Sequence, residues 1–272
     1  MTSHEKLENL RINLLSMECL AVAFSGGVDS TFLLQVASHV LEDRMIAVIV
    51  RSFVFPEREY EEAAAFAAQL SVKLITVDFD ESEVPGFSEN PVDRCYFCKK
   101  ALFSKIKAVA IENGIAFVAD GSNLDDTGDY RPGMAALKEL CIVSPLKDAG
   151  LTKEDIRALS REMDLPTWDK PSFACLATRF PYGEAITKEK LAAVGRAEQF
   201  LLDQGFRQVR VRCHGNVARI EVPAEDRARL LSGDLADKTY EAFKKLGFSY
   251  VALDLLGYRT GSMNEAFFEA NR

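Results

Sequence analysis

A glycine-containing turn near the start of the chain carries residue types that bind phosphate. The sequence SGGVDS occupies residues 25–30, between an apolar run over 19–24 and a second apolar pattern that starts at Thr31. Glycines between a strand and a helix let backbone amides approach a ligand closely, and the N-terminus of the helix favours anions. We therefore expect a phosphate-binding loop. Its candidate residues are Ser25, Gly26, Gly27, Asp29 and Ser30.

This loop differs from two familiar phosphate motifs. It lacks the lysine of the Walker A pattern GxxxxGK[ST], and its glycines are not spaced as in the dinucleotide pattern GxGxxG. A plain tight turn, in which Asp29 or Ser30 caps the following helix, is the alternative interpretation.

A second polar segment, DGSNLDDTGDYRPG, spans residues 120–133 and follows another apolar run. Parallel sheets place ligand-binding loops at the carboxyl ends of their strands. Asn123, Asp125 and Asp126 can bind a ribose, Mg²⁺ or an amide. The alternative is a solvated loop, because a polar composition alone is typical of turns.

Several cysteines have the spacing or the setting of metal or sulfur chemistry. Cys95 and Cys98 form a CxxC pair, and Cys175 lies in the irregular segment PSFACLATR. A CxxC pair can serve zinc binding, redox chemistry or an iron–sulfur cluster. Three cysteines leave one iron of a [4Fe-4S] cluster open to an external ligand. We expect the remaining cysteines to be small core residues, namely Cys19, Cys141 and Cys213.

Cys175 is flanked in the sequence by the cations Lys170 and Arg179. Cationic surroundings raise the thiolate fraction of a cysteine, which nucleophilic catalysis or sulfur donation requires. The alternative is a structural cysteine, buried between Phe173 and Leu176.

Arg210 and Arg212 have the spacing of one strand face. They lie in the alternating segment FRQVRVRCHGNVARIEV, in which Val209 and Val211 would face the core. Side chains two residues apart on a strand point the same way, so the two guanidiniums can clamp an anion. The alternative is a solvated pair on the outer face of a hairpin. Further candidates for the same task are Arg179 and Arg259.

These residues need a scaffold of alternating strands and helices. Unbroken apolar strands that alternate with helices are typical of a parallel sheet covered on both faces, so we expect an α/β fold with a doubly wound parallel sheet. The expected strands are 19–24, 45–52, 73–79, 116–122 and 141–146. The expected helices are 3–17, 31–41, 56–70, 95–112 and 152–165.

The pattern changes after Pro166. The next residues show no clear period and are expected to form a linker or active-site loop. A helix over 188–204 and a hairpin over 206–222 follow, which predicts a second, smaller α+β domain. The expected parts are a first domain over 1–166, a linker over 167–187 and a second domain over 188–272.

Composition and charge narrow the class of protein. The chain has 272 residues, of which 48% are hydrophobic, and a formal net charge of -8. This acidic balance argues against a surface that coats nucleic acid, and no apolar stretch approaches the roughly 20 residues of a membrane span. No secretory signal is visible, so we expect a cytoplasmic protein whose six cysteines do not form a disulfide framework.

As a set, these motifs resemble those of a known family. SGGVDS after the first expected strand resembles the pyrophosphate loop (PP-loop) of the ATP pyrophosphatase superfamily, whose domain is adenine nucleotide alpha hydrolase-like. SGGVDST, RCYFCKK, DGSNLDDTGDYRPG and PSFACLATRFPYG, together with the hairpin, resemble the LarE family. These are ATP-dependent pyridinium-3,5-biscarboxylic acid mononucleotide sulfurtransferases, which make the sulfur-bearing ligand of the nickel-pincer nucleotide.

The resemblance implies a reaction that uses ATP and Mg²⁺ at the SGGVDS loop. A carboxylate of the small pyridinium mononucleotide would be adenylated, and the loop would hold the departing pyrophosphate. A similar polar stretch in amide-forming members favours nucleotide contacts for Asn123, Asp125 and Asp126. Arg210 and Arg212 fall on the family's site for the substrate phosphate. The second domain would bind substrate and form a homo-oligomer, which is a hexamer in this family.

The family supplies sulfur in two ways. In its simplest members, the cysteine that matches Cys175 attacks the acyl-adenylate, forms a thioester and loses its sulfur, which leaves dehydroalanine. Other members carry a CxxC as well, and their [4Fe-4S] cluster transfers an extra sulfide. With Cys95, Cys98 and Cys175, this chain resembles the cluster type, and the sacrificial route is the alternative.

Three other functions share parts of this pattern. A tRNA-thiolating enzyme has the same loop and a three-cysteine cluster, but the net charge of -8 and the lack of an obvious basic, aromatic-rich domain argue against a nucleic-acid partner. An amide-forming synthetase that uses ammonia would not need Cys175. A non-enzymatic regulator would bind ATP without releasing AMP and pyrophosphate.

Overall fold

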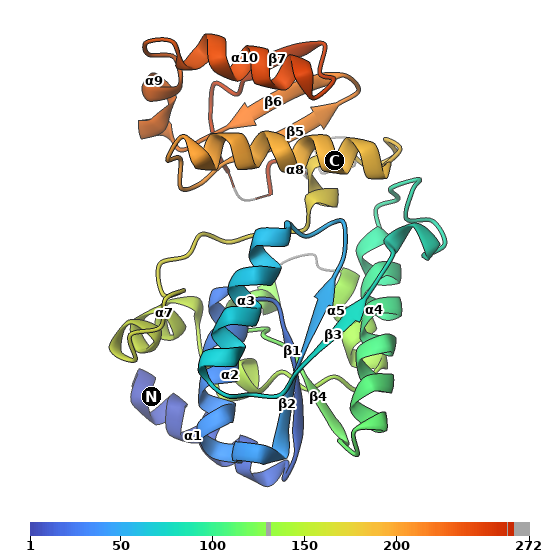
Figure 1. Ribbon diagram of the computed structural model, residues 1–272. Coiled ribbons are helices and arrows are strands. Elements are labelled where there is room, and N and C mark those ends of the chain that lie inside the picture. The colour runs from blue at the N-terminus through green and yellow to red at the C-terminus, as the bar shows by residue number, and fades with distance from the viewer. Residues whose placement is uncertain (129–131, 260, 264–272) are drawn as a thin grey trace. The chain divides into compact units, whose positions relative to one another are not determined.

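The chain folds into two compact units. The computed structural model describes residues 1–128, 132–259 and 261–263. The first unit comprises residues 1–84 and 93–173, and the second comprises 85–92 and 174–272 (Figure 1). Within the described ranges, no helix combines the length and the apolar character that a membrane crossing needs.

The first unit is built on a four-stranded parallel sheet in the order β3-β2-β1-β4. Val22 in β1 pairs with Ala47 in β2 on one side and with Ala119 in β4 on the other. The predicted parallel α/β sheet is therefore confirmed. The strands are β1 (Leu20–Phe24), β2 (Met45–Arg51), β3 (Leu74–Asp78) and β4 (Phe117–Ala119).

Helices cover both faces of this sheet (Figure 1). Leu20, Val22 and Phe24 point into one apolar core, whereas Ala21 points into the other, as the alternation of a strand requires. Burial on both faces explains the unbroken apolar run of β1. The first core is covered by α1 (Ser3–Ser16), α2 (Val28–Leu41), α3 (Glu57–Gln69) and α7 (Lys153–Glu162). The second is covered by α4 (Arg94–Glu112) and α5 (Pro132–Glu139).

The fifth strand expected over 141–146 does not form. Val143 makes a single parallel bridge with Ala119, and the chain turns at once into α6 (Pro145–Asp148). Proline lacks the N–H that a ladder needs and suits the first turn of a helix, so Pro145 ends the pairing. Cys141 also differs from expectation, because it is exposed and has a φ of 55°.

The second unit is an α+β structure with a mixed sheet in the order β5-β6-β7. β5 (Arg210–His214) and β6 (Val217–Glu221) form the expected antiparallel hairpin, and β7 (Tyr250–Leu253) joins β6 in parallel. Buried Val211, Leu201 and Phe243 lie in its apolar core. Its helices are α8 (Lys188–Asp203), α9 (Arg227–Leu230) and α10 (Leu235–Lys245).

Short 3₁₀ helices join several of these elements. They span Glu42–Arg44, Glu81–Glu83, Leu124–Gly128, Leu176–Arg179 and Ala224–Asp226. The compact units divide the chain at 173–174 and give residues 85–92 to the second unit. The functional division expected from composition, with a linker over 167–187, stays a proposal.

Candidate functional site

The SGGVDS loop leaves the end of β1 and opens α2. Gly27 is the N-cap of α2, and its carbonyl accepts the backbone N–H of Thr31 at 2.9 Å. Ser30 closes the loop on itself, because its Oγ lies 3.0 Å from Ser25 Oγ and 3.2 Å from the Gly27 carbonyl. The loop is therefore a preformed strand-to-helix turn at a helix N-terminus, the geometry that binds anions.

Gly26 is required by its conformation and by its neighbour. Its φ is +70°, which side chains rarely adopt, and an added Cβ would lie 2.8 Å from the Cβ of Ala63 in α3. The same Cβ would lie 3.4 Å from the carbonyl oxygen of Glu59. Close packing against α3 thus fixes the position of the loop.

The loop after β4 contacts the loop after β1. Asn123 Nδ2 donates to Asp29 Oδ1 at 3.3 Å, and a Cβ on Gly121 would lie 3.1 Å from the Ser30 nitrogen. β1 has β2 on one side and β4 on the other, so the chain reverses its direction of winding between β1 and β4. Ligands of open α/β sheets bind at this point.

A third segment, the start of α7, completes this corner of the first unit. The Lys153 ammonium pairs with Asp29, and the backbone N–H of Lys153 donates to Asp125 Oδ2 at 2.8 Å. Lys153 was not among the residues predicted from the sequence. Its position after the helix-capping Thr152 was the available signal, but only the fold brings α7 to this corner.

The polar side chains of the β4 loop also hold the loop in shape. Asp126 accepts the backbone N–H of Asn123 at 3.0 Å, and Asn123 Oδ1 accepts the N–H of Asp125 at 2.9 Å. Buried Asp120 accepts from Ser144 at 2.7 Å. Asn123 thus contacts Asp29 directly and Asp125 is linked to it through Lys153, while the contacts of all three with a ligand stay a prediction. Residues 129–131 of this segment lie outside the described residues.

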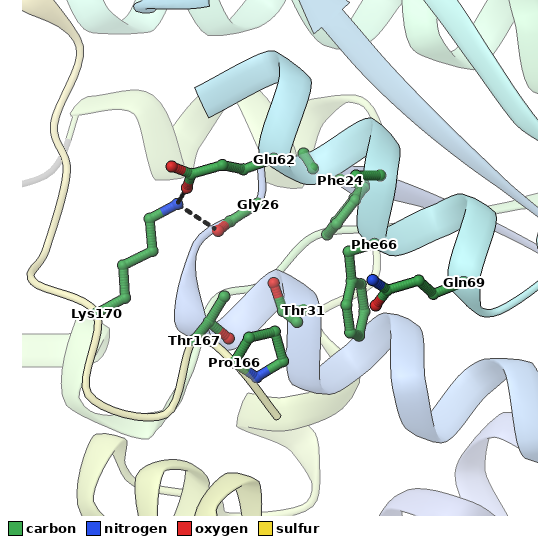
Figure 2. Close-up of a pocket in the computed structure, with 11 residues that line it drawn as sticks. Phe24, Gly26, Thr31, Glu62, Phe66, Gln69, Pro166, Thr167 and Lys170 are labelled. Atoms are coloured by element: carbon green, nitrogen blue, oxygen red, sulfur yellow. Dashed lines mark hydrogen bonds and ion pairs between the residues drawn. The ribbon is translucent and has the colours of Figure 1, made fainter. Parts of the chain in front are cut away.

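Lys170 fastens the segment after α7 to the SGGVDS loop (Figure 2). Its Nζ donates to the Gly26 carbonyl at 3.3 Å and pairs with Glu59 at 2.7 Å and Glu62 at 2.8 Å. From the sequence, Lys170 was expected only as a cationic neighbour of Cys175. The contact of Lys170 with the loop depends on tertiary packing, and no local sequence pattern predicts it.

The candidate metal cysteines are divided between the units. Cys95 and Cys98 are half-buried in the first turns of α4, and Arg94 Nη2 lies 3.7 Å from Cys95 Sγ. Cys175 belongs to the second unit, where it is the half-buried N-cap of the 3₁₀ helix Leu176–Arg179. Across the described part of the chain, no group of three or more His, Cys, Asp or Glu residues is arranged to hold a metal ion.

The remaining cysteines follow the expected core role only in part. Cys213 is buried, and burial raises the pKa of its thiol to about 11. Cys19 is half-buried beside β1. The expectation for Cys141 was wrong, because it occupies an exposed turn that follows α5.

The second unit contains a buried layer of arginines and carboxylates. Arg179 is 0% exposed, and its Nε and Nη2 donate to the two oxygens of Glu198 at 2.7 and 3.1 Å. Arg212 donates from Nε and Nη2 to Glu221 Oε2 at 3.0 and 2.7 Å. The alternative in which Arg210 and Arg212 lie in solvent on the outer face of the hairpin is wrong, because both side chains are buried within the second unit.

This layer is bonded to the segment that carries Cys175. The Cys175 carbonyl accepts from the N–H and the Oγ1 of Thr178 at 3.0 and 2.8 Å. Arg179 Nη1 donates to Thr178 Oγ1 at 2.7 Å, and Arg212 Nη1 donates to the Thr178 carbonyl at 3.1 Å. Arg179 and Arg212 thus position the backbone beside the candidate sulfur-carrying cysteine.

Arg210 is a buried cation near both another cation, Arg179, and a carboxylate, Glu198. Burial, together with the neighbouring charge of Arg179, lowers the pKa of its guanidinium to about 10. Its Cζ stacks 5.3 Å from the centre of the Tyr258 ring. Arg259 is bonded to Asp254 and to the Gly257 carbonyl, at 3.1 and 3.0 Å.

Comparison with known proteins identifies the family. A pyridinium-3,5-bisthiocarboxylic acid mononucleotide synthase from Lactiplantibacillus plantarum is 38% identical over 261 residues, which cover 94% of this chain and 93% of that enzyme. The chain belongs to the LarE family. An uncharacterised protein from Synechocystis sp. is 42% identical over 259 residues, covering 95% of this chain and 97% of the relative.

More distant similarity places this LarE-family chain among PP-loop proteins. The NAD synthase family model matches residues 8–107, which include the SGGVDS loop. A GMP synthase from Aeropyrum pernix is 25% identical over 208 residues, or 69% of this chain and 40% of that enzyme. The family resemblance drawn from the motifs is confirmed, and with it an ATP-dependent enzyme of the PP-loop superfamily.

Replacing Gly26 with alanine should destabilise the chain through both backbone strain and overlap with Ala63. The control is Gly150→Ala, which has a φ of +75° but no atom within 4 Å of the added Cβ. Backbone strain should cost about 1–2 kcal/mol at either position. Overpacking should add about 1–3 kcal/mol at Gly26 alone, measured by urea denaturation. Equal losses for the two variants would contradict the packing argument.

Replacing Arg179 with methionine should leave Glu198 buried without its cation. The expected loss of unfolding free energy is about 3–5 kcal/mol, measured by denaturant titration followed by circular dichroism. The control is Arg11→Met, because Arg11 pairs with Glu8 at an exposed site and should contribute less than about 1 kcal/mol. A loss at Arg179 no larger than the loss at Arg11 would show that the buried pair does not stabilise the second unit.

Proposed function

We propose that this chain uses ATP to convert a carboxylate of pyridinium-3,5-biscarboxylic acid mononucleotide into a thiocarboxylate. The observation that carries this proposal is the 38% identity, over 94% of the chain, to a synthase. The name of that synthase states its product, pyridinium-3,5-bisthiocarboxylic acid mononucleotide. The corner formed by Asp29, Asn123 and Lys153 supports an ATP-dependent reaction. The reaction belongs to the synthesis of the nickel-pincer nucleotide.

The first step is activation of the substrate by ATP. A carboxylate oxygen attacks the α-phosphorus, pyrophosphate leaves, and an acyl-adenylate forms. The proposed holder of pyrophosphate is the SGGVDS turn, since it lies at the N-terminus of α2. Mg²⁺ would neutralise charge on the phosphates. The nucleotide and metal contacts are assigned to Ser25, Gly26, Gly27, Asp29, Ser30, Asn123, Asp125 and Asp126.

The second step is displacement of AMP by sulfur. Cys175 is the proposed catalytic cysteine, and its backbone is held by Thr178 and the arginine layer. Cys95 and Cys98 stand three positions apart on α4, the spacing of two thiolates that can share a cluster. With Cys175 as the third ligand, a bound [4Fe-4S] cluster would supply a transferable sulfide. Sacrifice of the Cys175 sulfur is the alternative.

The substrate phosphate is assigned to the arginine layer. Arg210 carries this argument, because it is buried beside Arg179 and the two guanidiniums together can attract an anion. Arg212, Arg179 and Arg259 are the other proposed contacts. We also propose a cytoplasmic homo-oligomer, a hexamer by family resemblance, that acts on a small molecule rather than on nucleic acid.

The source of sulfur can be measured with protein purified under anaerobic conditions. Iron and sulfide analysis should find one cluster per chain, and substitution of Cys98 with alanine should abolish it. Several turnovers with ATP, substrate and added sulfide, which replaces each sulfide transferred, should then leave the intact mass unchanged. Loss of one sulfur and two hydrogens per chain would instead show that Cys175 is sacrificed. Full activity of Cys175→Ala would overturn both routes and favour an ammonia-dependent synthetase.

Replacing Arg210 with glutamine should weaken binding of the mononucleotide. We expect the KM for the mononucleotide to rise at least about tenfold, the effect of losing one charge-assisted contact, while the KM for ATP stays unchanged. The control is Arg227→Gln, because the hydrogen bonds of Arg227, to Ala224 and Leu255, are exposed. An unchanged KM for the mononucleotide would remove Arg210 from the substrate site.

A further inference from the structure

The peptide bond between Gly26 and Gly27 lies where the SGGVDS loop enters α2. Gly26 has a φ of +70°, and Gly27, the N-cap of the helix, has a φ of -78°. Glycine populates both signs of φ, so a peptide flanked by two glycines flips more easily than its neighbours. The first N–H groups of a helix have no intrahelical partner. The direction of the Gly27 N–H therefore decides whether it can bind an anion at this helix terminus.

Lys170 fixes this peptide from the side of α3 (Figure 2). The Lys170 ammonium donates to the carbonyl oxygen of Gly26 at 3.3 Å. The C=O and the N–H of one trans peptide point in opposite directions. A Gly26 carbonyl that is held toward Lys170 therefore turns the Gly27 N–H to the other side of the loop.

The Lys170 ammonium is itself held in one place. Its other acceptors are the α3 carboxylates of Glu59, at 2.7 Å, and Glu62, at 2.8 Å. A lysine ammonium has three N–H donors, and these two carboxylates and the Gly26 carbonyl can use all three. The side chains of Lys170 and Glu59 are only 15% and 9% exposed, so solvent screens their pairing little. In this arrangement Lys170 is a fixed donor to the loop, with no N–H to spare for a phosphate.

The backbone that carries Lys170 is also anchored. Arg157 of α7 donates from Nη1 to the Trp168 carbonyl at 2.7 Å and from Nη2 to the Lys170 carbonyl at 2.8 Å. The backbone N–H of Lys170 donates to the Thr167 carbonyl at 3.0 Å. Lys170 thus joins α7, α3 and the SGGVDS loop, all of which belong to the first unit.

We infer that Lys170 is a positioning residue of the pyrophosphate site. It holds the Gly26 carbonyl so that the Gly27 N–H is already directed at the pyrophosphate when ATP is cleaved. A donor that is oriented in advance needs no reorganisation during the reaction. This role rests on the proposed function, because it requires that the SGGVDS loop bind pyrophosphate, and it needs no contact between Lys170 and ATP.

Binding of pyrophosphate with Mg²⁺ to the full-length chain, measured by calorimetry, tests this role. Lys170→Met should weaken pyrophosphate about tenfold or more, the effect of one lost hydrogen bond to a charged group, and should leave the affinity for AMP within about twofold. A variant that merely loosens the unit would lose both ligands. The control is Lys6→Met, because Lys6 pairs with Asp155 at 2.6 Å in the same unit and is similarly shielded, at 18% exposed. It should change neither affinity.

NMR can follow the Gly27 amide directly. The chain has 16 glycines, so nitrogen-15 labelling of glycine alone gives a simple spectrum, in which Gly27→Ala identifies the signal. Alanine fits at this position, because φ is negative and the nearest atom to an added Cβ is Ser25 Oγ at 3.5 Å. Saturating pyrophosphate should move the Gly27 amide proton downfield in the wild type and in Lys6→Met. The movement in Lys170→Met should be less than about half as large.

Glu62→Gln separates positioning from direct contact with phosphate. Glutamine keeps an oxygen that accepts from Lys170, so the affinity for pyrophosphate should stay within about twofold of the wild type. If Lys170 left its carboxylates to bind the phosphate, removal of the competing charge would tighten pyrophosphate about fivefold or more, and the positioning role would be overturned. This result stands without Lys170→Met, because the Glu62 side chain is 50% exposed and its exchange for glutamine does not threaten the fold.

Two further outcomes would overturn the role of Lys170. Equal affinity for pyrophosphate in the wild type and in a folded Lys170→Met would remove Lys170 from the site and leave the proposed function of the loop intact. Failure of the wild type to bind either pyrophosphate or ATP would refute the proposed function of the loop, and the role of Lys170 with it. Thermal unfolding of each variant establishes that the proteins compared are folded.

Discussion

The Asp29 carboxylate is the contact on which the candidate nucleotide site depends. It lies in the first turn of α2 and bonds to Asn123 of the β4 loop and to the Lys153 ammonium of α7. These three segments are distant in sequence and meet because β1 and β4 are neighbours in the sheet. The junction therefore turns a glycine-containing turn into a corner with cationic, amide and carboxylate groups at fixed positions.

A second constraint operates in the second unit, where charge rather than apolar packing fills one layer. Arg179 and Arg212 are paired with Glu198 and Glu221, and Arg210 adds a third buried guanidinium. Removing one member of a buried pair is costly, so the layer holds its members in one arrangement. Bonds from this layer reach the Cys175 segment through Thr178. An acidic chain thus concentrates cations where an anionic substrate is proposed to bind.

The periodicity of the sequence was sufficient for most of the first unit. The apolar runs at β1 and β2 and the helix of the CxxC pair lie where the pattern placed them. The expected strand over 141–146 failed because Pro145 starts α6, and a single bridge at Val143 remains. Pro145 was the available signal in the sequence, because proline interrupts a ladder.

The sequence by itself determined the local features: the SGGVDS turn, the alternation of strands with helices, and the hairpin that carries Arg210 and Arg212. These depend on residues close together in the chain, so period and turn chemistry reveal them. Only the tertiary structure decided that Lys153 and Lys170 contact the loop region, that the hairpin arginines are buried, and that residues 85–92 join the second unit. Burial and long-range pairing depend on which distant segments pack together, and local sequence does not encode that.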